Sequence, residues 1–71
     1  MKLKDLLDYM DKDELVVICK SINNITLKVV FKGEADDAKS SIYANDYVIH
    51  IEQTELSNEQ YIEIWLMGEK R

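Results

Sequence analysis

The sequence predicts a small α+β domain, in which a four-stranded, largely antiparallel sheet carries an N-terminal helix and a short middle helix on one face. Hydrophobic periodicity gives the order helix, strand, strand, helix, strand, strand. A lone hairpin is not stable by itself, and the apolar stripe of an amphipathic helix must be buried. These elements should therefore pack as two layers. The length of 71 residues suits one thin core, and we expect a single domain over residues 1–71.

Residues 2–13, KLKDLLDYMDKD, predict a short amphipathic helix. Leu3, Leu6, Leu7 and Met10 follow the i, i+3, i+4, i+7 spacing that forms one apolar stripe, and charged residues occupy the other positions. The stripe should pack against the sheet.

Two strands and a tight turn follow. Residues 14–20, ELVVICK, are rich in β-branched side chains, and residues 25–32, ITLKVVFK, alternate in polarity. Asn23 and Asn24 between them tolerate the left-handed backbone of a tight turn. This combination predicts an antiparallel hairpin.

The segment 34–46, EADDAKSSIYAND, predicts a short second helix or a helical turn. Acidic residues suited to a helix N-terminus come first, and Ala35, Ala38 and Ile42 follow at helical spacing.

Two more strands complete the fold. Residues 46–54, DYVIHIEQT, and residues 60–67 alternate in polarity, and the polar residues 55–60, ELSNEQ, predict the turn between them. As the C-terminal strand, residues 60–67 would leave one edge free for pairing with another chain.

Side-chain parity divides the strand residues between two sheet faces. The expected helix-covered core is Leu3, Leu6, Leu7, Met10, Val17, Leu27, Val29, Phe31, Ile49, Ile51, Ile62, Ile64 and Leu66. The expected opposite face contains Tyr61, Trp65, Met67, Val48 and His50, with Val30, Val16 and Ile18 beside them.

That opposite face is more apolar than a solvated face requires. Aromatic residues and methionine are enriched at the centres of protein interfaces, and apolar patches on small proteins mark interaction sites. We therefore expect Tyr61, Trp65, Met67, Val48 and His50 to bind a protein partner, either a second copy or a host protein. In the alternative, Trp65 and Met67 close over the sheet edge or pack beneath the C-terminal residues.

Candidates for catalysis and ligation are few. Cys19 and His50 are single residues of their types, which excludes an internal disulfide and a multi-histidine metal site. If Val17 faces the core, Cys19 does too, and a thiol on the side opposite His50 cannot be activated by it. Gly33 and Gly68 stand alone, so no phosphate-binding loop is present. We expect no enzymatic activity, no metal and no cofactor.

The net charge of −5 disfavours nucleic acid and anionic lipid as partners. The candidate acidic surface consists of Asp8, Asp11, Asp13, Glu34, Asp36 and Asp37. These carboxylates either serve solubility or imitate phosphates in a partner's basic groove. No apolar run reaches the roughly 20 residues of a membrane span, and the opening MKLKDLLDYM lacks an unbroken apolar signal-peptide core. We expect a cytoplasmic protein.

The opening MKLKDLL, the acidic connector DKDE, the β-rich LVVICK and the acid-rich helical insert before two closing strands resemble the short accessory proteins of phages and prophages. That setting includes anti-CRISPR proteins and other inhibitors of host defence nucleases, which act by binding and blocking. The resemblance implies a similar anti-defence role in the host cytosol.

Three functional hypotheses result. The first is a non-enzymatic module that binds a protein through the apolar sheet face, with a homodimer as its simplest form. The second is an acidic nucleic-acid mimic. The third is a homo-oligomer that sequesters a small ligand at a subunit junction.

Overall fold

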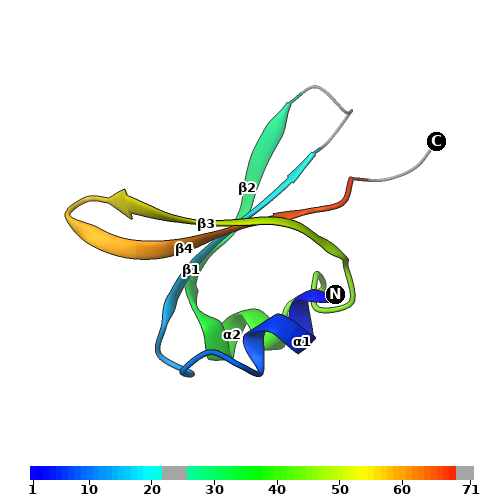
Figure 1. The fold of residues 1–71 in the computed structure, drawn as a ribbon, viewed down its shortest axis with the longest axis horizontal. Coiled ribbons are helices and arrows are strands. Elements are labelled where there is room, and N and C mark those ends of the chain that lie inside the picture. Colours follow the sequence, from blue (N-terminus) through cyan, green and yellow to red (C-terminus); the bar gives the residue numbers. More distant parts are fainter. Residues whose placement is uncertain (22–25, 69–71) are drawn as a thin grey trace.

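The computed structural model describes residues 1–21 and 26–68, in which two short helices and a four-stranded sheet follow the predicted order (Figure 1). The elements are α1 (Leu3–Leu7), β1 (Leu15–Ser21), β2 (Leu27–Glu34), α2 (Ala35–Lys39), β3 (Val48–Leu56) and β4 (Glu59–Leu66). The predicted α+β class is confirmed. The predicted turn at Asn23 and Asn24 lies outside the described residues.

The strand order is β2-β1-β4-β3, with antiparallel β1·β2 and β3·β4 pairs and a parallel β1·β4 pair in the middle. The sheet is therefore mixed. β4 lies inside it, so the expectation of a free edge on the C-terminal strand is wrong. β2 and β3 are the two edge strands, because the parallel pair brings the two hairpins together through β1 and β4.

Both helices lie on the same side of the sheet, and the two hairpins diverge from there in different directions (Figure 1). Lys39 Nζ on α2 forms an ion pair with Asp8 Oδ1 beyond α1, at 3.2 Å. No helix among residues 1–21 and 26–68 is long and apolar enough to cross a membrane.

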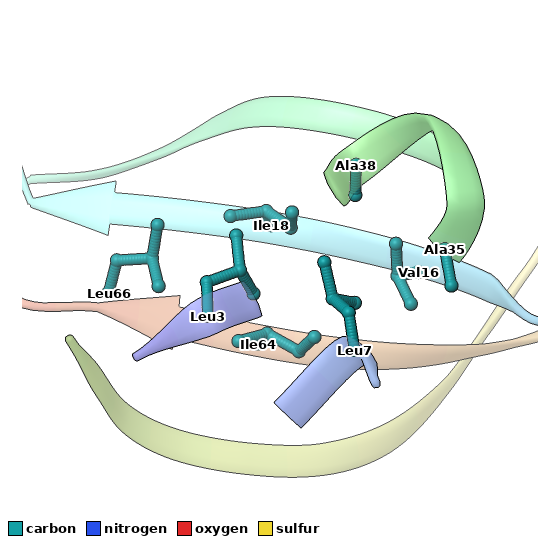
Figure 2. Packing of buried hydrophobic residues seen from close by; sticks show 8 residues of the cluster. All are labelled: Leu3, Leu7, Val16, Ile18, Ala35, Ala38, Ile64 and Leu66. Atoms are coloured by element: carbon teal, nitrogen blue, oxygen red, sulfur yellow. The ribbon is translucent and has the colours of Figure 1, made fainter. Parts of the chain in front are cut away.

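The main core lies between the helices and the middle strands. Its buried side chains, drawn in Figure 2, are Leu3, Leu7, Val16, Ile18, Ala35, Ala38, Ile64 and Leu66. The two α2 residues in this core, Ala35 and Ala38, have small side chains. The helix backbone can therefore approach β1 and β2 closely. The helical stripe and the parity of β4 agree with the sequence analysis, since Leu6, Met10 and Ile62 also pack against this core.

The predicted parity of β1 is wrong. Val16 lies beside Ile62, and Ile18 lies beside Ile64, on the helix-covered face. Val17 consequently faces the opposite side. The run Leu15–Cys19 is apolar on both faces, so its periodicity could not decide which residues point towards the helices.

Bulges move other residues away from their predicted positions. The β1·β2 register shifts between the pairs Ile18–Phe31 and Cys19–Val29, so Phe31 stays on the core side and the exposed Val29 and Leu27 do not. The shift leaves Val30 packed against the core, where the sequence had placed it on the opposite face.

A second register shift, between Val48 and His50, leaves Ile49 without a partner in β4. Val48 pairs with Leu66 and packs against the main core, so its predicted place on the opposite face is wrong. Ile51 lies opposite Ile64 and so on the helix-covered face, as expected, but β3 is an edge strand and Ile51 remains exposed rather than in the core. Ile49 is exposed as well.

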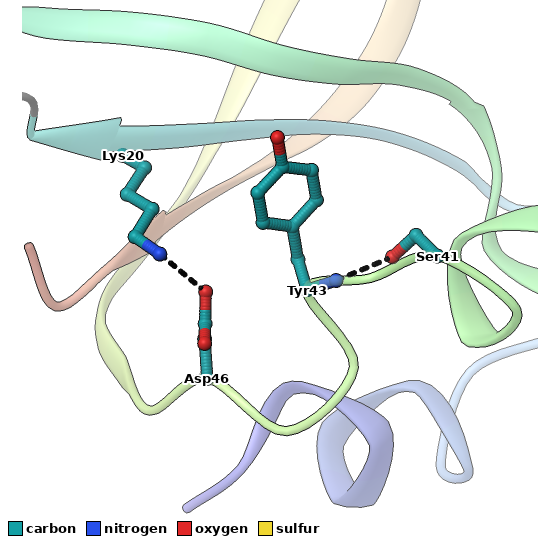
Figure 3. Close-up of polar contacts among 4 residues, drawn as sticks. All are labelled: Lys20, Ser41, Tyr43 and Asp46. Carbon is teal, nitrogen blue, oxygen red and sulfur yellow. Dashed lines mark hydrogen bonds and ion pairs between the residues drawn. The ribbon is translucent and has the colours of Figure 1, made fainter.

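The connection from α2 to β3 is held by polar contacts (Figure 3). Lys20 Nζ donates to Asp46 Oδ2 at 2.8 Å and lies 5.6 Å from the centre of the Tyr43 ring. Ser41 Oγ accepts from the Tyr43 N–H at 3.3 Å and donates to the Ala38 carbonyl at 2.7 Å. The predicted short helix is present as α2, and these contacts hold the chain that follows it.

Candidate protein-binding surface

Trp65 lies on the sheet face opposite the helices, which we call the open face. It alternates with Ile64 and Leu66 of the main core, and its register partners are Cys19 on β1 and His50 on β3. The parity predicted for β4 is therefore confirmed. Cys19, Trp65 and His50 form one row across three neighbouring strands.

Carboxylates hold both rings of this row. The Trp65 indole N–H donates to Glu63 Oε2, and His50 Nε2 lies 2.6 Å from Glu52 Oε1. Glu52 and Glu63 are themselves register partners. Two carboxylates directly opposite each other repel. Here each carboxylate points to a ring nitrogen on its own strand instead, Glu63 to Trp65 and Glu52 to His50.

The centre of the open face is a second small core. Val17, Cys19 and Tyr61 are buried there, and Leu15, Leu56 and Trp65 pack against them. Tyr61 retains only 7% of its exposure, and Lys32 Nζ lies 5.4 Å from its ring centre. Tyr61 is thus a packing residue within the chain rather than part of an exposed patch.

Met67 lies apart from that cluster. It follows the end of β4, donates its backbone N–H to the Tyr47 carbonyl at 2.8 Å, and is exposed. It lines a shallow hollow with Lys20, Asn45, Asp46, Tyr47 and Gly68. Of the five predicted partner-binding residues, His50 and Trp65 contact each other and Tyr61 joins Trp65's cluster, whereas Met67 and Val48 lie elsewhere.

Besides Leu27 and Val29 on β2, the predicted core residues that are exposed lie along β3. Ile49 is 56% exposed and Ile51 is 46% exposed, and Tyr47 precedes them with half of its surface free. The N-terminal residues cover only the start of this edge, where the Val48 N–H donates to the Met1 carbonyl at 2.8 Å. No sequence signal separated these isoleucines from core residues, because an edge strand and a central strand share the same alternation.

A hollow beside α1 adds to the apolar surface on the helix side. Its lining consists of Leu6, Tyr9, Met10, Asp11, Glu14 and Ile62. Tyr9 is highly exposed. Ile62 lies on the same face as Ile51 and Ile64, further along the β3·β4 ladder, so the hollow and the β3 edge belong to the same side of the hairpin.

The acidic residues gather at the helical end of the sheet. The Asp36 N–H donates to the Lys12 carbonyl at 2.9 Å, and the Ala35 N–H donates to the Glu14 carbonyl at 2.8 Å. These bonds place the loop containing Asp11 and Asp13 beside the start of α2. We call Asp11, Asp13, Glu14, Glu34, Asp36 and Asp37, all exposed, the acidic pole. Asp8 is separately ion-paired with Lys39.

Cys19 is buried in the second core. It lies on the same sheet face as His50, not opposite it as predicted, but Trp65 stands between them. Burial raises the pKa of the Cys19 thiol above its ordinary value, and the negative charge of Glu63 adds to this. A thiol that is neutral at physiological pH is a poor nucleophile. Within residues 1–21 and 26–68, no group of three or more His, Cys, Asp or Glu side chains could hold a metal ion.

No protein-family model, curated protein or solved structure matches the chain.

Proposed function

We propose that this protein is a non-enzymatic binding module that engages another protein through the edge strand β3. The observation that carries the proposal is the exposure of Ile49 and Ile51 on a strand with an open edge. An edge strand offers backbone N–H and C=O groups to an incoming strand, and exposed isoleucines add apolar area beside them.

Residues of the open face add a second contact surface on the same strand. His50 is exposed, and its ring rests on Trp65, so a partner that pairs with β3 meets this aromatic pair on one side and Ile51 on the other. Pairing with β4 holds β3 in place, and the ring contact with Trp65, which packs against the second core, holds His50. A rigid, partly apolar strand of this kind binds with little loss of conformational entropy.

The resemblance to phage accessory proteins extends the proposal to a setting. In a phage or prophage setting, the chain occupies a surface of its partner protein and thereby blocks the partner's activity. The raised pKa of the buried Cys19 thiol supports a role without covalent chemistry.

Site-specific photo-crosslinking in cells tests the proposal. A photoreactive phenylalanine analogue replaces Ile51 in one version of the chain and Ile42 in a matched control. Ile42 is 87% exposed and lies outside β3, in the connection between α2 and β3. We expect a discrete crosslinked protein from position 51 and none from position 42. Equal or absent crosslinking at both positions contradicts a binding role for β3.

The acidic pole supports a second candidate, an electrostatic decoy for a basic groove. The backbone bonds from Ala35 and Asp36 bring its carboxylates together from two segments. Binding by this route weakens steeply with added salt, and is lost in a combined Asp13→Asn, Asp36→Asn and Asp37→Asn variant but not in Ile51→Lys. The reverse pattern identifies β3 as the binding element.

A further inference from the structure

We propose that the partner of β3 is a second copy of this chain, paired antiparallel along β3 about a two-fold axis that passes through Ile51. This inference rests on the proposed function and specifies its partner. The two sheets then join into one continuous sheet, with the helices of both copies on the same face.

The β3 edge is available for such pairing. β3 is the outermost strand, and from Ile49 to Leu56 its outer side makes no backbone bond to a non-strand segment among residues 1–21 and 26–68. The other edge strand, β2, also exposes two apolar side chains, Leu27 and Val29, but the exposed Lys28 and Lys32 lie beside them. Lysines on an edge strand are a feature by which natural sheets keep that edge from pairing.

Symmetry fixes which residues meet. A two-fold axis normal to the sheet keeps each face on its own side, and a residue before Ile51 faces the residue equally far after it in the other copy. His50 then faces Glu52 of the second copy, and Glu52 faces the second copy's His50. Both residues are on the open face, as the register of β3 with β4 shows. The sequence His-Ile-Glu is therefore complementary to itself in hydrogen bonding, because an imidazole meets a carboxylate at both contacts.

Other registers are less favourable. A shift that places Glu52 on the axis sets two identical carboxylates against each other, and like charges directly opposite destabilise a sheet. A one-residue offset places open-face residues opposite core-face residues, which the pleat does not allow.

The helix-covered side of the joint is apolar. Ile51 lies opposite Ile64 of the main core, and its exposed surface meets Ile51 of the second copy on the axis. Ile49, also exposed, lies at the bulge that precedes this stretch. The N-terminal residues at Val48 limit the pairing to the strand beyond it, so the joint is short and we expect reversible association.

Charge exchange at His50 and Glu52 tests this geometry. Sedimentation velocity of the purified full chain, from about 1 μM to about 1 mM, yields the dimer dissociation constant. In His50→Glu both contacts become repulsive, and in Glu52→Lys both become cation against imidazole, so each variant should raise the constant by about tenfold.

An equimolar mixture of His50→Glu and Glu52→Lys should associate as tightly as the wild type. In the mixed dimer the introduced glutamate of one copy faces the introduced lysine of the other, which is an attractive pair. The second contact is the wild-type one, with His50 facing Glu52. Failure of the mixture to restore association overturns the two-fold arrangement.

Two further variants complete the design. Glu55→Lys makes the same charge change on the same strand outside the proposed contacts, and should leave the dissociation constant unchanged. Ile51→Lys, at an exposed position, should abolish association without loss of the fold, which circular dichroism checks. An effect of Glu55→Lys equal to that of Glu52→Lys also overturns the arrangement.

The outcomes also separate this inference from the proposed function. A chain that stays monomeric, while the Ile51 crosslinker captures a different protein, overturns self-pairing and leaves β3 as a binding edge. A chain that neither self-associates nor crosslinks at position 51 above the Ile42 control contradicts both.

Discussion

The imidazole of His50 lies across the β3·β4 pair from the indole of Trp65, with ring centroids 4.5 Å apart and ring planes tilted by 46°. Trp65 covers the second core from one side, while Glu63 binds its N–H and His50 contacts its ring. The chain's single tryptophan is therefore half-buried on the open face by its own neighbours, and the partner-accessible part of this pair is His50.

We expect His50→Ala to lower the free energy of unfolding by about 0.5–1 kcal/mol, because it removes a cross-strand ring contact. His50→Phe keeps a ring over Trp65 and should lose less. Urea unfolding followed by Trp65 fluorescence measures both, at concentrations low enough for a monomer. Equal losses in the two variants would show that the ring contact contributes nothing.

Cys19 should make the protein less stable at alkaline pH. Its thiol has a raised pKa in the folded chain, so the unfolded chain ionises first as pH rises. This contribution to stability is complete below the pH at which an exposed thiol ionises, and is lost as pH rises through the folded-state pKa. We expect the free energy of unfolding to fall more between about pH 7 and about pH 10 in the wild type than in Cys19→Ala.

Comparing the pH slopes removes the effect of the cavity that Cys19→Ala creates, since a cavity costs the same at every pH. Glu63→Gln supplies a second check, because it removes the smaller of the two causes of the shift. The Cys19 thiol of the Glu63→Gln variant should react faster with iodoacetamide than the wild-type thiol at pH values near neutrality. Parallel pH profiles for wild type and Cys19→Ala would contradict the assignment.

The turn between β3 and β4 carries strain that a glycine can relieve. Ser57 has φ 51° and Asn58 has φ 68°, the left-handed pair of a two-residue hairpin turn. Asn58→Gly should raise the free energy of unfolding by up to about 1 kcal/mol, because a Cβ disfavours this conformation. Thermal unfolding measures the change.

Asn45 is the matched control for the turn. It is an exposed asparagine whose φ is not positive, so Asn45→Gly should lower stability through the added freedom of the unfolded chain. A stabilising effect at both positions would locate the gain outside the turn geometry.

Ile51 and Ile64 are cross-strand partners with opposite exposure, and their alanine variants should differ accordingly. Ile64 is fully buried, so Ile64→Ala should cost about 2–5 kcal/mol. Ile51→Ala should cost about 1 kcal/mol or less in the monomer, because nearly half of the side chain is already in water. Urea unfolding at low protein concentration measures both, and similar losses would contradict the exposed edge.

The place of Trp65 on the candidate surface was predictable because parity within one strand is local, whereas the exposure of Ile49 and Ile51 was not. Once Ile64 faces the helices, Trp65 must face away, and the structure places it there. The alternation of β3 did not predict the position of Val48, because the bulge at Ile49 reverses parity between Val48 and His50. A bulge depends on the partner strand and leaves no mark in a single strand's polarity.

The sequence by itself determined the six elements, their order and the apolar stripe of α1, because helix and strand periodicities arise from neighbouring residues. Only the tertiary structure decided that β4 pairs parallel with β1, that Val16 and Ile18 face the helices, and that Ile49 and Ile51 lie at an edge. These features depend on which distant strands meet and on how much surface the two short helices cover. An apolar residue has the same local pattern whether a neighbouring strand shields it or water reaches it.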